Sequence, residues 1–132
     1  MFRNYIETLY YYSNIQKLPE FLYSMSLKEF FDYMKNVKYK KQIFESIDRE
    51  PLDIIINGGD CGEKVKCCMI YFNDKGLDYD VIFLKSGFNL FHVFNRVYIA
   101  GDAIDFDVAM GDLNLGERYN LNEVARFEIR KR

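Results

Sequence analysis

The hydrophobic pattern of this chain changes its period once, at Gly76. Before it, residues 60–75 carry apolar side chains at helical spacing, and Gly76 stands where a helix commonly ends on a glycine. After it, segments 79–85 and 90–99 are rich in β-branched and aromatic residues, and apolar and polar positions alternate along the second. The pattern therefore predicts a chain that contains both helices and a sheet.

Two more strands are predicted, over 103–108 and 123–131, with a turn at Gly101-Asp102 and a loop over 110–122. Consecutive strands joined by short turns favour an antiparallel sheet of about four strands. Helices first and strands afterwards predict the α+β class, with N-terminal helices followed by a helix packed on that sheet. The 132 residues fit a single domain, 1–132, made of a helical part, 1–56, and a helix-plus-sheet part, 57–132.

The first fifty residues are predicted to be helical. Ser26 and Glu29 have capping-box spacing, and apolar residues follow them at helical intervals. A further helix is expected over 40–47 and is expected to end at Pro51. Asn57-Gly58-Gly59 then breaks the chain before the next helix.

Composition narrows the classes of partner. A net charge of −2 gains little from binding phosphates, so nucleic acid is not expected as a partner, and the basic end at 130–132 is read as a solvated tail. No stretch is long and apolar enough to span a membrane, no signal peptide is apparent, and three cysteines make a poor disulfide framework, so a cytoplasmic location is expected. Tyr and Phe crowd the N-terminal helices, which suggests a possible surface for a protein partner besides a core role.

Cys61 is the first candidate for chemistry. It follows a glycine pair and Asp60, and it opens the predicted helix. The unpaired amides and positive dipole end of a helix N-terminus favour a thiolate, which is the reactive form of cysteine. A structural cysteine is the alternative interpretation of this position. Cys67 and Cys68, deeper in the same helix, are interpreted as small core residues.

His92 is the only histidine, in the middle of the strand 90–99. It is either a core residue or the base that a nucleophilic thiol needs. Asp105 and Asp107 share one face of the next predicted strand, which a hairpin brings within reach of His92. Each is either a surface residue or the carboxylate that orients the base.

Metal sites are less favoured by the pattern. The three cysteines and His92 lack the paired spacing of zinc sites, and the acidic residues 102, 105, 107 and 112 lack the spacing of a calcium-binding loop. No metal and no cofactor is therefore expected.

Three short motifs carry a resemblance to the transglutaminase-like superfamily, which has a papain-like cysteine protease core. The segment 57–65, NGGDCGEKV, resembles the Gly-Asp-Cys segment that opens the nucleophile helix of this family. The segment 92–98, HVFNRVY, resembles its histidine strand, and 103–108, AIDFDV, is similar to its aspartate segment. Ala103 stands where the family usually has tryptophan, and Val108-Ala109 replaces its usual continuation.

The resemblance implies a catalytic triad of Cys61, His92 and Asp107, with Asp107 rather than Asp105 as the orienting acid. It implies a cysteine protease or amidase, or an acyltransferase, that acts on a protein or peptide amide through a thioester. The alternative is a catalytically silent fold that serves as a binding or assembly module. Small free-standing members of this superfamily are often bacteriophage proteins, so the resemblance suggests a bacteriophage origin. In that case the protein would be located in the host cytoplasm or in the virion.

Overall fold

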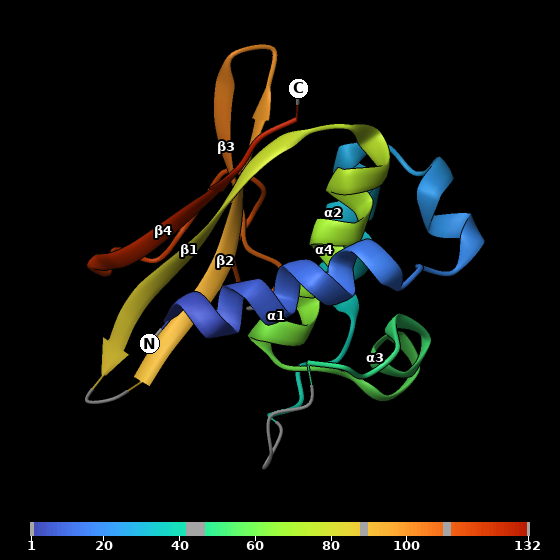
Figure 1. The fold of residues 1–132 in the computed structure, drawn as a ribbon, viewed down its shortest axis with the longest axis horizontal. Coiled ribbons are helices and arrows are strands. Elements are labelled where there is room, and N and C mark those ends of the chain that lie inside the picture. Colours follow the sequence, from blue (N-terminus) through green and yellow to red (C-terminus); the bar gives the residue numbers. More distant parts are fainter. Residues whose placement is uncertain (1, 42–46, 88–89, 110–111, 132) are drawn as a thin grey trace.

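The computed structural model describes residues 2–41, 47–87, 90–109 and 112–131. Its helices precede its strands, which confirms the predicted α+β class (Figure 1). The helical elements are α1 (Phe2–Ile15), the short 3₁₀ helix η1 (Glu20–Ser24), α2 (Leu27–Asn36), α3 (Pro51–Asn57) and α4 (Cys61–Lys75). The strands are β1 (Asp78–Gly87), β2 (Leu90–Ile99), β3 (Asp102–Phe106) and β4 (Glu123–Ile129).

The four strands form one sheet in the order β3-β2-β1-β4, and each neighbouring pair is antiparallel. The helices lie on one side of this sheet, where α4 packs on the strands and the N-terminal end of α1 also reaches them (Figure 1). The other face carries a smaller cluster of Ile82, Leu84 and Phe94, which Tyr119 and Leu121 from the loop before β4 partly cover. Residues that alternate along β2 therefore enter two different environments.

Helix α4 is buried all round, whereas the sequence predicts one apolar face. Every residue from Gly62 to Phe72 is buried, including Lys64 and Lys66. The Asp60 side chain accepts a hydrogen bond from the Glu63 amide, and the left-handed Gly76 ends the helix as predicted. The helix on which the site depends is thus held on every side.

The two buried lysines are stabilised by backbone carbonyls. Lys64 Nζ donates to the carbonyl oxygens of Val37 at 2.5 Å, Val108 at 3.3 Å and Met34 at 3.4 Å. Lys66 Nζ donates in the same way to the carbonyls of Ile47 and Arg49. These bonds offset part of the cost of burying a cation, and they join α4 to chain segments distant in the sequence.

One sequence-based prediction is wrong in this region, and another falls mostly outside the described residues. Pro51 does not end a helix but begins α3, because its fixed φ suits the first helical position and its missing N–H costs nothing there. Of the helix expected over 40–47, residues 42–46 lie outside the described residues, Lys40 and Lys41 are not helical, and Ile47 lies in a turn.

The third strand is shorter than predicted. Strand β3 ends at Phe106, which pairs with Asn95, so the expected extension to residue 108 does not form. Asp107 therefore lies one residue beyond the ladder and is free to leave the plane of the sheet. The turn before β3 consists of Ala100 and Gly101, both at positive φ, as in the two-residue hairpin turns that match the twist of a sheet.

Candidate active site

Cys61 occupies the first position of α4, as predicted, and it is only partly buried. The chain reaches this position through Gly58, whose φ of 93° favours glycine, and through Gly59, which pairs with the segment around Tyr39. The Gly59 amide donates to the Lys38 carbonyl at 3.0 Å, and the Lys40 amide donates to the Gly59 carbonyl at 2.9 Å. A short parallel pairing therefore fixes the start of the helix that carries the thiol.

Gly62, the next residue, touches helix α1. A Cβ built on Gly62 would lie 1.9 Å from the hydroxyl oxygen of Tyr5, which no side chain can tolerate. Only glycine allows the Tyr5 ring to approach the first turn of α4 so closely. The N-terminal half of α1 is thus fitted against the helix start beside Cys61.

His92 lies on β2 with a side-chain exposure of only 7%. Its ring stacks near Phe94, at a centroid distance of 6.2 Å, and meets the edge of Tyr119 at 5.9 Å. The ladder between β2 and β3 runs from Asn95 to Ile99, so it stops before His92 is reached. The imidazole therefore lies at a part of β2 where the chain after β3 can approach it.

Asp107 makes that approach. Its Oδ2 atom lies 2.5 Å from His92 Nε2, and its side chain is 1% exposed. Its Oδ1 atom accepts a hydrogen bond from the Ala109 amide at 3.1 Å. The Lys64 ammonium group bonds to the neighbouring Val108 carbonyl, so the buried lysine of α4 also holds the segment that carries this acid.

Asp105 lies elsewhere, although it is only two residues away. Its Oδ1 atom accepts a hydrogen bond from Arg96 Nε at 2.6 Å, and the two side chains are 15% and 17% exposed. The sequence left both acids open as partners of the histidine, and the structure places only Asp107 on its ring.

The Cys61 thiol lies near enough to the His92 ring to influence the charge on that ring. Because Asp107 occupies Nε2, the nitrogen left for sulfur is Nδ1. Burial disfavours the charged ring, but the bond to Asp107 and the nearby Cys61 thiol outweigh it and raise the pKa of His92 to about 9. The structure thus pairs His92 with Asp107 and places Cys61 near the ring, while the catalytic roles of all three stay a prediction.

The other candidate groupings do not assemble. Cys67 and Cys68 are fully buried, and Asp112 accepts a hydrogen bond from the Tyr119 hydroxyl at 2.9 Å. Across residues 2–41, 47–87, 90–109 and 112–131, no three His, Cys, Asp or Glu side chains are placed to hold a metal ion. In the same part of the chain, no helix is long and apolar enough to cross a membrane.

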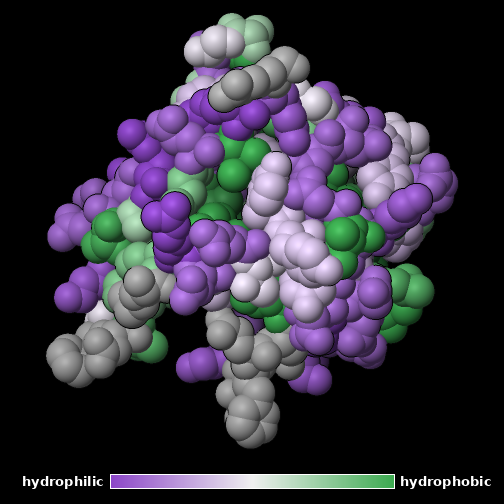
Figure 2. Space-filling model, in the orientation of Figure 1, coloured by the Kyte–Doolittle hydropathy of each residue, from purple (hydrophilic) through white to green (hydrophobic). Residues whose placement is uncertain are grey.

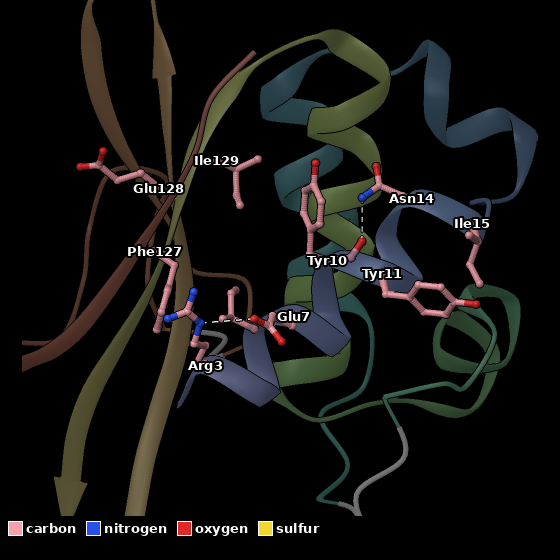
Figure 3. Close-up of a pocket in the computed structure, with 10 residues that line it drawn as sticks. Arg3, Glu7, Tyr10, Tyr11, Asn14, Ile15, Phe127, Glu128 and Ile129 are labelled. Atoms are coloured by element: carbon pink, nitrogen blue, oxygen red, sulfur yellow. Dashed lines mark hydrogen bonds and ion pairs between the residues drawn. The ribbon is translucent and has the colours of Figure 1, made fainter. Parts of the chain in front are cut away.

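Helix α1 borders several hollows, of which two matter here. The first, of about 640 Å³, opens beside Cys61. The second, of about 720 Å³, lies between α1 and β4, and the described residues that line it include none of Cys61, His92 and Asp107 (Figure 3). Hydrophobic residues lie recessed in this part of the surface among hydrophilic ones (Figure 2). Although it is larger, the second hollow lies away from the thiol, so the first is the one relevant to chemistry at Cys61.

Sequence reasoning missed three residues that shape the site: Tyr5 against Gly62, Lys64 beneath the Asp107 segment, and Tyr119 against His92. Tyr5 and Tyr119 come from distant segments without a local signal for contact with the site. Lys64 had a signal in principle, because it lies on a helix whose neighbouring residues are mostly apolar.

Comparison with known proteins does not identify a family for this chain. No protein-family model matches the chain, and no curated protein matches it. Among solved structures it is similar to a proposed cysteine protease from Cytophaga hutchinsonii, with 17% sequence identity and a TM-score of 0.48. The match covers 75% of this chain and 42% of the other, so the chain spans less than half the length of that protein. At this level of similarity, function has to be argued from the side chains themselves.

Proposed function

We propose that this chain is a transglutaminase-like cysteine hydrolase that acts on a protein or peptide amide, with Cys61 as nucleophile, His92 as acid–base and Asp107 as orienting acid. One observation carries the proposal: the buried His92 ring binds the Asp107 carboxylate through Nε2, and the half-buried Cys61 thiol lies near enough to influence the charge on the same ring. A base that is itself oriented by a third group is the arrangement by which proteins activate a nucleophile.

The resting state follows from the charge on the ring. With its pKa near 9, His92 holds a proton at neutral pH, and we propose that its Nδ1–H faces the Cys61 sulfur. Asp107 stabilises this imidazolium and keeps the ring in place. The resting site therefore carries a proton on His92 that can be given to a leaving amine.

Acylation begins when the Cys61 sulfur attacks the amide carbon. The carbonyl oxygen takes up the negative charge, and the Cys61 amide, one of the N–H groups that a helix cannot pair internally, can donate to it. The C–N bond then breaks as His92 gives its proton to the leaving amine, which leaves a thioester on Cys61. Deacylation reverses these roles: neutral His92 takes a proton from water, the hydroxide attacks the thioester, and the thiolate leaves as the imidazolium is restored.

An amine in place of water would give a transglutaminase reaction. We propose hydrolysis, because a domain of this size offers little surface for an ordered second substrate.

The test is the formation of an acyl-enzyme on Cys61. The protein is mixed with the p-nitrophenyl ester of an N-acetyl amino acid, quenched, and digested for mass spectrometry. We expect the acyl group on Cys61 and a loss of roughly 10²–10⁴-fold in its rate of formation in His92→Gln. Cys61→Ala measures the background, and thermal unfolding of each variant confirms that it is folded.

A catalytically silent binding module is the alternative, and the hollow between α1 and β4 favours it. Strand β4 is an edge strand, and an edge can accept a further strand from another chain. Tyr11 and Ile15, which line this hollow from α1, are 59% and 56% exposed. Acylation separates the two functions, because a silent module would give equal signals from the wild type and Cys61→Ala.

A further inference from the structure

The hollow beside Cys61 contains an almost continuous aromatic wall. Phe2 lies 4.5 Å from Phe83 and 5.0 Å from Phe91 between ring centroids, and Tyr5 lies 5.8 Å from Phe83. These four rings come from α1, β1 and β2, and together with Cys61 they line one cavity of about 640 Å³. That volume lies within the range of sites that enclose small ligands.

The polarity of the lining restricts what can bind there. Among the described residues that line the cavity, none is Asp, Glu, Lys, Arg or His. Its polar members include Asn4 and Thr8, both exposed on α1 and therefore at the rim. A charged side chain would lose its hydration here without gaining a partner, whereas an aromatic ring would find edge-to-face and stacked partners.

The alternation of β2 indicates which part of a substrate enters the cavity. Phe91 and Val93 line it, whereas His92, which lies between them on the strand, is not among the described residues that line it. His92 has to protonate the leaving amine, so the leaving group lies on the histidine side of Cys61. The cavity on the other side is left for the acyl part of the substrate, which stays attached to Cys61.

We infer that this cavity is the acyl-side specificity pocket, and that it selects substrates with a large apolar side chain, aromatic above all. The inference rests on the proposed cysteine hydrolase function and names the substrate class for the same site. Discrimination comes from apolar surface removed from water, which an aromatic side chain has and glycine lacks.

The experiment compares two esters that differ only in this side chain, the p-nitrophenyl esters of N-acetyl-L-phenylalanine and N-acetylglycine. Acyl-Cys61 formation is measured for both by mass spectrometry, with Cys61→Ala as background. We expect the phenylalanine ester to acylate Cys61 about 10- to 100-fold faster, as burial of one aromatic side chain implies. Phe91→Ala should lower this ratio several-fold, and Thr8→Phe should lower it by filling the cavity from its rim.

Phe21→Ala is the matched control, because Phe21 is 50% exposed on η1 and does not line the cavity. It should keep the wild-type ratio. Equal rates for the two esters, with Cys61 still acylated, would overturn the pocket and leave the proposed function standing. No acylation of Cys61 by either ester would overturn both. Thr8→Phe alters an exposed helix position, so it decides the matter if Phe91→Ala does not fold.

Discussion

The first turn of α4 and its middle carry the same side chain, a thiol, in two different environments. Cys61 is half-buried, lies near the His92 imidazole and borders a cavity. Cys67 and Cys68 are fully buried two turns later, and burial raises the pKa of the Cys67 thiol to about 12 and that of the Cys68 thiol as well. Position along the helix, and not residue type, therefore decides which cysteine can react.

The middle of α4 serves the site in another way. Lys64 and Lys66 are buried there and hold backbone carbonyls on segments far from α4 in sequence. Burial lowers the pKa of both lysines, since the charged form loses its hydration. Their ammonium groups anchor the chain, including the segment after Asp107, while the first turn is left accessible for chemistry.

The sharpest test of this comparison is the reactivity of the three thiols. Iodoacetamide at neutral pH should label Cys61 about a thousandfold or more faster than Cys67 or Cys68, because the buried pair is reached only when the protein opens. Mass spectrometry of digests taken over time gives all three rates from one sample. In urea the three rates should converge; comparable rates in the folded protein would contradict the comparison.

The second prediction concerns pH, because His92, which lies near the first turn of α4, forms an ion pair with Asp107 when its ring is protonated. The pKa of His92 is raised from 6.5 to about 9, so its stabilising contribution is complete below pH 6.5 and is lost as pH rises through about 9. We expect the free energy of unfolding to fall over this window by roughly 2–3 kcal/mol more in the wild type than in His92→Asn.

Urea unfolding at pH 6 and pH 9.5 measures both proteins. Val65→Ala is the control from the buried middle of the helix, and it should keep the wild-type dependence on pH because it removes no titrating group. An equal fall in the wild type and His92→Asn would show that the ion pair is not linked to folding.

Local sequence signals predicted much of this fold. The bounds of β2 agree with the alternation over 90–99, and α4 begins and ends where Asp60 and Gly76 predict. Capping and alternation are signals between neighbours in the chain, so they can be read without knowing the fold. Pro51 was misread because a proline suits both the end of one helix and the start of the next.

The candidate site needed longer-range information. Asp105 and Asp107 share a face in any regular strand, so alternation could not separate them. The family resemblance implied Asp107, and the structure gives the physical reason: the ladder ends at Phe106, which frees the next residue to turn toward His92. Tyr5 and Tyr119 reach the site from distant segments, and a single sequence holds no signal for such contacts.

Gly62 offers a way to disturb the first turn while leaving the buried middle intact. In Gly62→Ala the new methyl group would overlap the Tyr5 hydroxyl, so we expect a loss of about 1–3 kcal/mol in the free energy of unfolding. Tyr5→Phe removes that oxygen, and the next ring atom lies 3.2 Å from the added Cβ. The double variant should therefore recover most of the loss when measured by urea unfolding.

The smallest expected effect separates the two aspartates. Asp107→Asn removes the charge that stabilises the His92 imidazolium, so iodoacetamide labelling of Cys61 at neutral pH should slow by roughly tenfold, which corresponds to about one pKa unit of lost interaction. Asp105→Asn is the matched control, since it makes the same chemical change two residues away on a carboxylate that binds Arg96. It should lower stability slightly, as expected for a partly exposed ion pair, and leave the labelling rate near that of the wild type.

The ratio of the labelling rates of Asp107→Asn and Asp105→Asn is the decisive quantity, because a general loosening of the β2–β3 hairpin would change labelling in both variants. A larger loss in Asp105→Asn would reassign the orienting acid, and equal rates in all three proteins would mean that neither carboxylate controls the thiol at the first turn of α4.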